Sequence, residues 1–284
     1  MRNLSTLAWR VYDAPTKPWH GVVADTEGDD SVYVMRVERR DGVSQLTLAH
    51  ITPTGTEELA VLEVASAPPH VPDVADFRLL ADGGSSVNHM PAICVIGSGG
   101  DIVLMPVDEE ASAPAEVVGS VDQGILAAAW SPEEDVLVLI TGGEKRLIVM
   151  TREFEVMSET MLSTEAFGDD QPVNVGWGSK STQFHGSEGK QAAMAAANAP
   201  EESDPRGPLV PEDDGLPRIS WRGDGAFFVT SSAEASNDAV HRILRTYTRT
   251  GTLSATSDRS VRGISHVLAC RPTGNLIATT QRMG

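Results

Sequence analysis

A repeated pattern with nearly constant spacing constrains this chain more than any other feature. An apolar run leads to a tryptophan, a turn pair follows, and a second apolar run ends near Thr or Ser. Three occurrences carry Trp130, Trp177 and Trp221, and in a fourth Cys270 takes the place of the indole. The spacings are 47, 44 and 49 residues. A period of ~40–45 residues is typical of one four-stranded blade of a WD-type β-propeller.

The segments between these motifs indicate β-hairpins. RILRTYT and TLSATSD flank a turn at residues 249–251, and SQLTLAHI and EELAVLEVA flank a Pro/Gly turn at residues 52–55. The runs are short and rich in β-branched residues, and no stretch of about twelve residues has a helical period. The sequence therefore predicts an all-β fold over residues 1–284. We expect a partial, N-terminal, WD40-like β-propeller that is incomplete, with about five to six four-stranded blades.

A four-stranded sheet cannot cover both of its faces with its own side chains, so it must stack on neighbouring sheets. Trp130, Trp177, Trp221 and Cys270 are therefore predicted to pack between adjacent blades. The last repeat stops inside a blade. This predicts an unpaired strand edge at residues 276–284 and self-association through that edge.

Residues 187–217 interrupt the pattern. They contain five prolines, seven acidic residues and no aromatic residue. Such a composition buries too little apolar surface to offset the ordering of the chain. The sequence therefore predicts a disordered insertion within one blade.

The charge of the chain bears on its partners. It has 40 acidic and 22 basic residues, a formal net charge of −18, which argues against binding to the phosphate backbone of a nucleic acid. Residues 218–284 differ, with four acidic and nine basic side chains. Those arginines could form a local surface for an anionic partner, but solvent-facing positions on alternating strands such as HRILRTYTRT are favoured. The sequence contains no apolar run long enough to span a membrane and no signal peptide. We therefore expect the chain to be located in the cytoplasm and also in the nucleus.

No motif for a cofactor, a metal or a nucleophile stands out. The glycines at 97–100 lack the third glycine of a dinucleotide fingerprint. His185 and Glu188 have no second histidine at ligand spacing. The acidic clusters at 108–110 and 133–135 lie in predicted turns, which favours solvated loops over paired catalytic carboxylates. We expect no catalytic residue, no cofactor and no metal.

The segment GWGSKSTQFHGS departs from its sister repeats, because polar residues surround Phe184 where the others have an apolar strand. Two interpretations stay open. The segment is either a weakened edge strand or a contact site for another protein. In the second case Phe184 is the anchor, with Gln183, His185 and Lys190 around it.

Several segments resemble the largest subunit of the Elongator complex. They are VGSVDQGILAAAWSPEEDVLVLITG, LIVMTREFEVMSETM, ISWRGDGAFFV, GNLIATTQ and, most specifically, GWGSKSTQFHGSEGKQAA. The resemblance covers most of residues 75–284 and, more loosely, the N-terminus. It implies the N-terminal propeller of a scaffold in the complex that modifies the wobble uridine of certain transfer RNAs. It also implies the other subunits as partners, with the chemistry in a separate radical-SAM and acetyltransferase-like subunit.

The chain also departs from that family. Members are several times longer and add a second propeller, a helical-repeat region and a C-terminal part for dimerisation and tRNA contact. We therefore expect a C-terminally truncated chain that lacks the homodimerisation region and does not contact tRNA directly. The family's seven blades cannot close with about six units. A generic propeller interaction module with an unrelated partner remains the alternative, and a propeller hydrolase with carboxylates at its central channel is a third, weaker one.

Overall fold

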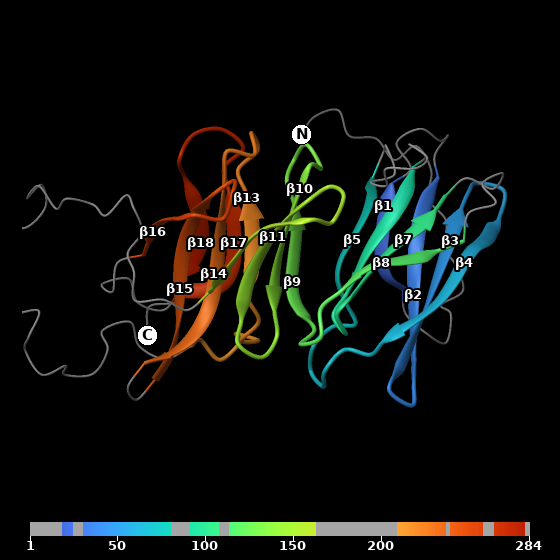
Figure 1. Cartoon of the computed structure of the whole chain (residues 1–284), viewed down its shortest axis with the longest axis horizontal. Coiled ribbons are helices and arrows are strands. Elements are labelled where there is room, and N and C mark those ends of the chain that lie inside the picture. The colour runs from blue at the N-terminus through green and yellow to red at the C-terminus, as the bar shows by residue number, and fades with distance from the viewer. Residues whose placement is uncertain are drawn as a thin grey trace, which may run out of the picture. The chain divides into compact units, whose positions relative to one another are not determined.

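The computed structural model describes residues 19–24, 31–80, 91–107, 114–162, 209–236, 239–257 and 264–281. The regular elements in these ranges are all β-strands, in four four-stranded sheets and one two-stranded sheet (Figure 1). Each sheet is antiparallel, and strands that follow one another in the sequence lie side by side. No helix in these ranges is long and apolar enough to cross a membrane. The predicted all-β class is confirmed.

The chain divides into two compact units, residues 1–125 and 126–284. Two sheets make up the first unit. Sheet A consists of β1 (Trp19–Ala24), β2 (Val32–Arg40), β3 (Val43–Ile51) and β4 (Thr56–Ala65). Sheet B consists of β5 (Val74–Leu80), β6 (Ala92–Gly97), β7 (Asp101–Pro106) and β8 (Glu116–Ser120).

Sheets A and B share one core. Met35 and Leu48 of sheet A and Ile93 and Met105 of sheet B are fully buried in it. All six residues of β6 are buried, so this strand reads as a continuous apolar run rather than an alternating one. Burial of both faces of an inner strand is what stacking between sheets requires.

Three sheets make up the second unit. Sheet C consists of β9 (Ile125–Trp130), β10 (Val136–Thr141), β11 (Arg146–Thr151) and β12 (Val156–Met161). Sheet D consists of β13 (Arg218–Trp221), β14 (Phe227–Ser236), β15 (Ala239–Thr248) and β16 (Leu253–Thr256). Sheet E consists of β17 (Ile264–Cys270) and β18 (Ile277–Gln281).

Sheets C and D pack directly on each other. Val138 and Val149 of sheet C lie in one buried cluster with Phe228 and Tyr247 of sheet D. The two aromatic rings stack with centroids 5.4 Å apart and an interplanar angle of 11°. Aromatic pairs of this kind contribute about 0.5–1.5 kcal/mol beyond the area they bury.

This direct packing changes how the sequence repeat is interpreted. The sequence predicted a blade that begins around Trp177, between those of Trp130 and Trp221. Trp177 lies outside the described residues, and the described residues of the core between sheets C and D come from these two sheets and from Leu162, just after β12. The step of 91 residues from Trp130 to Trp221 is therefore one step between neighbouring sheets, as is the step of 49 from Trp221 to Cys270.

The turn after the first strand repeats in sheets C, D and E. In each, the backbone N–H of the residue after Trp130, Trp221 or Cys270 donates to the carbonyl oxygen five positions further on. The three hydrogen bonds measure 2.8, 3.0 and 2.9 Å. The same local geometry in three successive sheets shows that the sequence motif marks one structural position.

Sheet E is the incomplete part of the propeller. It has two strands where the other sheets have four, and no described strand pairs with the outer edge of β18. Val267, Leu276 and Ile277 are exposed here. The predicted incompleteness is confirmed, with four full sheets and one half sheet among the described residues, while self-association through β18 stays a prediction.

Candidate functional site

Two of the predicted packing residues, Trp221 and Cys270, lie at junctions between sheets, and Trp130 is buried within sheet C. Trp130, Trp221 and Cys270 are the last residues of β9, β13 and β17. Trp130 is 4% exposed and meets the ring of Phe154 edge-on, with centroids 6.0 Å apart. Trp221 packs against the core shared by sheets C and D, and its indole N–H donates to the carbonyl oxygen of Ala129 at 3.2 Å.

Cys270 joins sheet E to sheet D. Its backbone N–H donates to Ser220 Oγ at 2.9 Å, and its thiol donates to the Ser220 carbonyl oxygen at 3.3 Å. Burial raises the pKa of the Cys270 thiol above its ordinary value. The thiol therefore stays protonated and acts as a hydrogen-bond donor at a sheet junction.

The other predicted site residues lie outside the described part of the chain. They are Trp177, Gln183, Phe184, His185, Glu188, Lys190 and the acidic residues at 108–110. The structure does not test their predicted roles, and these stay predictions.

The acidic cluster at 133–135 belongs to a junction between sheets. Ser131 Oγ donates to Asp135 Oδ1 at 2.6 Å, and the guanidinium of Arg249, from the turn between β15 and β16, binds the other carboxylate oxygen. Arg249 also lies 4.0 Å from Glu133. These carboxylates tie the turn of sheet C to the turn of sheet D.

Two arginines of β15 are buried, whereas the sequence reading favoured solvent-facing positions for them. Arg242 and Arg245 are 2% and 1% exposed. They lie three residues apart and so on opposite faces of the strand. Arg245 reaches across to β14, where both oxygens of Glu234 accept its hydrogen bonds. Neighbouring structure covers both faces of β15, so a charge on either face has to be paired inside the protein.

The pair formed by Arg242 and Asp213 anchors the segment before β13. Nε and Nη2 of Arg242 donate to the two carboxylate oxygens of Asp213 at 2.5 and 2.6 Å, and both side chains are fully buried. The Gly215 N–H donates to the same carboxylate at 2.7 Å. Burial alone would raise the pKa of Asp213, but these hydrogen bonds and the guanidinium charge hold it below its ordinary value.

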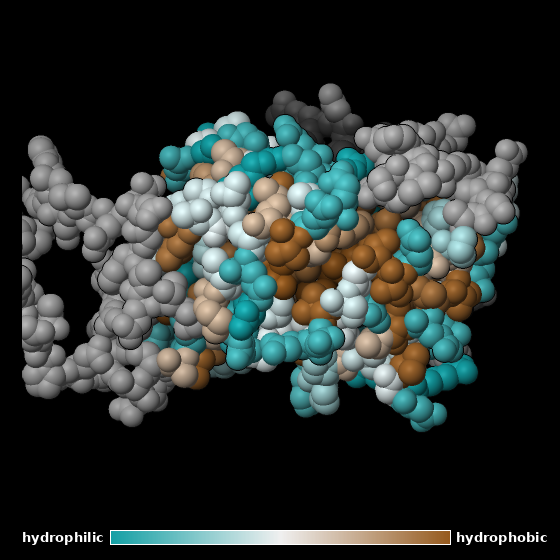
Figure 2. Space-filling model, viewed as in Figure 1, coloured by the Kyte–Doolittle hydropathy of each residue, from teal (hydrophilic) through white to brown (hydrophobic). Residues whose placement is uncertain are grey.

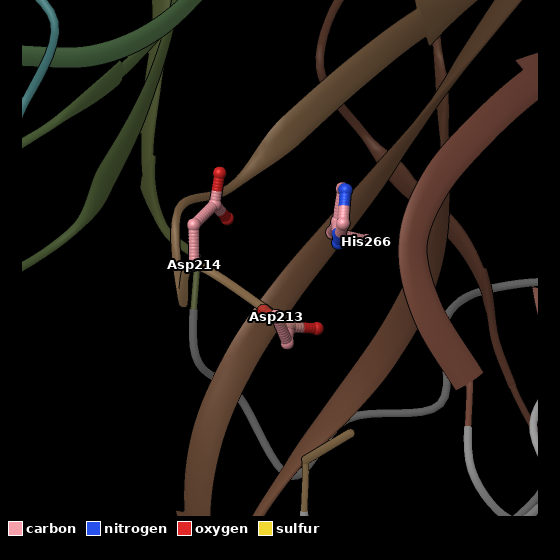
Figure 3. A group of neighbouring side chains, drawn as sticks. All are labelled: Asp213, Asp214 and His266. Atoms are coloured by element: carbon pink, nitrogen blue, oxygen red, sulfur yellow. The ribbon is translucent and has the colours of Figure 1, made fainter. Parts of the chain in front are cut away.

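Asp214 and His266 complete this cluster. Figure 3 shows Asp213 and Asp214, from the segment before β13, gathered with His266 of β17. One ligand-type atom from each residue lies within 4.8 Å of the others. Asp214 accepts a hydrogen bond from the guanidinium of Arg218 and lies 3.6 Å from that of Arg242. Burial alone would raise the pKa of Asp214, but the hydrogen bonds from Arg218 and the Leu216 N–H hold it below its ordinary value.

Two carboxylates and a histidine are a set that divalent metals use. Here both carboxylates are already bound by guanidinium groups, and Arg218 and Arg242 balance the two negative charges. A dication would have to enter beside these fixed positive charges. The arrangement therefore fits an ion-pair cluster that joins sheets D and E better than a metal centre.

The cluster also redefines the end of the predicted insertion at 187–217. Residues 187–208 lie outside the described residues, and residues 209–217 are described. The Leu209 N–H donates to the Val240 carbonyl oxygen at 2.9 Å, and Asp213 is buried against Arg242. The acidic, proline-rich composition suggested disorder, yet here the carboxylates are the groups that hold the segment in place.

The whole chain, residues 1–284, matches the family described as "ELP1 first N-terminal beta-propeller". Elongator complex protein 1 of Mus musculus is 34% identical over 292 residues, 99% of this chain and 19% of that protein. The Drosophila melanogaster protein of the same name is 40% identical over 194 residues, 67% of this chain and 14% of that protein.

Among solved structures, the chain is similar to the C-terminal WD40 domain of Sif2, with a TM-score of 0.45 and 15% identity. That alignment covers 88% of this chain and 51% of the other. The chain spans about a fifth or less of the length of the relatives that it matches in sequence. With a match from its first residue to its last, the chain belongs to the Elongator complex protein 1 family and corresponds to its first N-terminal β-propeller.

Proposed function

We propose that this chain acts as a non-catalytic scaffold part of the Elongator complex. It holds other subunits, the catalytic one included, through protein–protein contacts, and through them it supports modification of the wobble uridine of transfer RNA. The observation that carries the proposal is the family match along the entire chain, together with the stacked sheets that this family name describes.

The use of polar side chains supports a scaffold role. The carboxylates of Asp135 and Asp213 are each bound by an arginine at a sheet junction. A general acid or base needs a free proton-transfer position beside a substrate, and a carboxylate bound by a guanidinium has lost it. Both carboxylates instead form ion pairs that join neighbouring segments of the fold.

The net charge supports contact with proteins rather than with tRNA. The chain carries −18, and its basic region, residues 218–284, places Arg242 and Arg245 in buried ion pairs. Arg249 is paired with Asp135 as well. A phosphate backbone is bound by free cationic side chains, so these three arginines are not available for it.

Co-purification tests the proposal. The chain is expressed with a tag together with the other Elongator subunits, and retention of the catalytic subunit is measured. We expect retention by the wild-type chain, a marked loss with Phe184→Ala, and no change with the control Val61→Ala at an exposed residue of β4. An assembly that keeps its catalytic subunit after deletion of residues 1–284 would refute the proposed function.

A further inference from the structure

The outer strand of sheet C carries an unusual share of exposed apolar side chains. Val156, Met157 and Met161 of the six-residue strand β12 are 58%, 45% and 46% exposed. The outer strands of sheets A and B each carry one large exposed hydrophobic residue, Val61 and Val117. Figure 2 shows that hydrophobic residues do reach the surface among hydrophilic ones on the face in view. Single exposed apolar residues are ordinary, but three on one short strand form a patch.

The strand register fixes the direction of this patch. Thr160 and Ser158 pair with Leu147 and Val149, which belong to the core shared with sheet D. Met161 and Glu159 pair with Arg146 and Ile148, which alternate with Leu147 and Val149 along β11, and so they lie on the face that points away from sheet D. At the start of β12 a β-bulge shifts the register beside Met150. No described strand pairs with the outer edge of β12, so this edge is open within the second unit.

The surroundings of the patch are acidic. Glu159 and Glu144 share the guanidinium of Arg146, at 2.8 and 2.9 Å, which leaves one negative charge in excess. Glu153 and Glu155 are exposed in the turn that leads into β12. Residues 126–162, the part of the second unit that forms sheet C, contain seven acidic and three basic side chains, Arg152 of the same turn among the basic ones, a net charge of −4. A partner that binds here gains most from a positively charged rim.

We propose that Val156, Met157 and Met161 form a docking surface for another protein subunit, one whose contact surface has apolar side chains at its centre and Lys or Arg around them. This inference rests on the proposed function, because it takes the partner to be a subunit of the same assembly. Methionine side chains are flexible and polarisable, and they adapt well to an apolar partner surface. Buried apolar anchors inside a polar rim are the usual anatomy of a protein interface.

Site-specific photo-crosslinking tests the inference. A photoreactive residue replaces Met157 in the chain assembled with the other Elongator subunits. The control replaces Val61, which is 46% exposed on the outer strand of sheet A. We expect a crosslink from position 157 to a net basic segment of another subunit and none from position 61. The double variant M157E/M161E should weaken the association by about tenfold or more, and V61E should leave it unchanged.

The outcomes separate this inference from the proposed function. An assembly that forms without a crosslink at position 157, or with a crosslink to a second copy of this chain or to an acidic segment, overturns the inference alone. A wild-type chain that does not assemble with the other subunits at all overturns the proposed function, and the inference falls with it.

Discussion

The indole N–H of Trp221 donates a hydrogen bond to the carbonyl oxygen of Ala129, the residue before Trp130. The bond joins the first strand of sheet D to the first strand of sheet C. The tryptophan that ends the first strand of sheet D is therefore fixed to the backbone of the first strand of sheet C. We expect Trp221→Phe, which keeps a ring and loses the donor, to lower the free energy of unfolding by about 1 kcal/mol.

The matched change Trp221→Ala should cost more, about 2–4 kcal/mol, because it also removes the ring from the core of sheets C and D. Urea unfolding followed by tryptophan fluorescence and circular dichroism measures both values. Equal losses for the two variants would mean that the ring does not pack at the junction.

The close approach of sheet D to sheet C also predicts the effect of a glycine substitution. Gly251 has a φ of +87°, and a Cβ there would lie 2.4 Å from Ser158 Oγ and 2.8 Å from Val149 Cγ2 of sheet C. Gly274 has nearly the same φ, +84°, and open space around it. Gly274→Ala costs only the left-handed backbone conformation, about 1 kcal/mol, whereas Gly251→Ala also forces the side chains of Ser158 and Val149 to shift.

We therefore expect Gly251→Ala to destabilise the protein by at least about 1–2 kcal/mol more than Gly274→Ala. The difference between the two urea midpoints gives this quantity. Identical midpoints would show that the turn around Gly251 does not pack closely against β11 and β12.

The buried pair Asp213–Arg242 predicts strong coupling. Either Asp213→Asn or Arg242→Met leaves one charged or polar partner uncompensated in a buried position, at a cost of about 3–5 kcal/mol. The double variant should cost clearly less than the two single changes combined, because neither charge remains. A double-mutant cycle measures the coupling, and additive single costs would contradict the ion-pair account.

The same pair predicts a direction of pH dependence. The pKa of Asp213 is lowered in the folded protein, so the pair stabilises the fold above the ordinary aspartate pKa of about 4. This contribution is lost as the pH falls further, through the lowered folded-state pKa. Asp213→Asn should therefore destabilise the protein strongly at pH 7 and much less at pH 2.5.

The buried carboxyl group of Asp76 predicts the opposite dependence of stability on pH. Burial raises the pKa of its carboxyl group to about 6 in the first unit. Between pH ~4 and pH ~6 the folded chain binds more protons at Asp76 than the unfolded chain, so stability falls as the pH rises. Asp76→Asn should be more favourable relative to wild type at pH 7 than at pH 4, by about 2–3 kcal/mol.

Unfolding at a series of pH values tests this, with Glu57→Gln as the control because Glu57 is exposed on β4. The control should show the same difference from wild type at both pH values. A difference for Asp76→Asn that does not vary between pH 4 and pH 7 contradicts the raised pKa.

The fold was largely readable from the sequence, because its signals are local. The spacing of Trp221 and Cys270 marks the last residue of a first strand in two successive sheets. Turn residues and β-branched runs located the hairpins around residues 52–55 and 249–251. The packing predicted for Trp177 falls outside the described residues and stays a prediction.

The ion-pair cluster was not readable, because it depends on distant contacts. Asp213 and Arg242 are 29 residues apart, and only the register of β14 with β15 and the position of the segment before β13 bring them together. The composition of residues 187–217 suggested a disordered segment instead, because acidic residues beside prolines are typical of disorder. A buried arginine on a strand gives no local pattern that distinguishes it from an exposed one.

We propose that this propeller serves the Elongator complex as a scaffold and not as its enzyme. The most direct test measures the modified wobble uridine of transfer RNA, together with the subunit composition of the complex, in cells whose Elongator complex protein 1 lacks the segment corresponding to residues 1–284. We expect the modification to be lost together with the catalytic subunit from the assembly. Full modification, or its loss from an assembly that still holds every other subunit, would contradict the scaffold role.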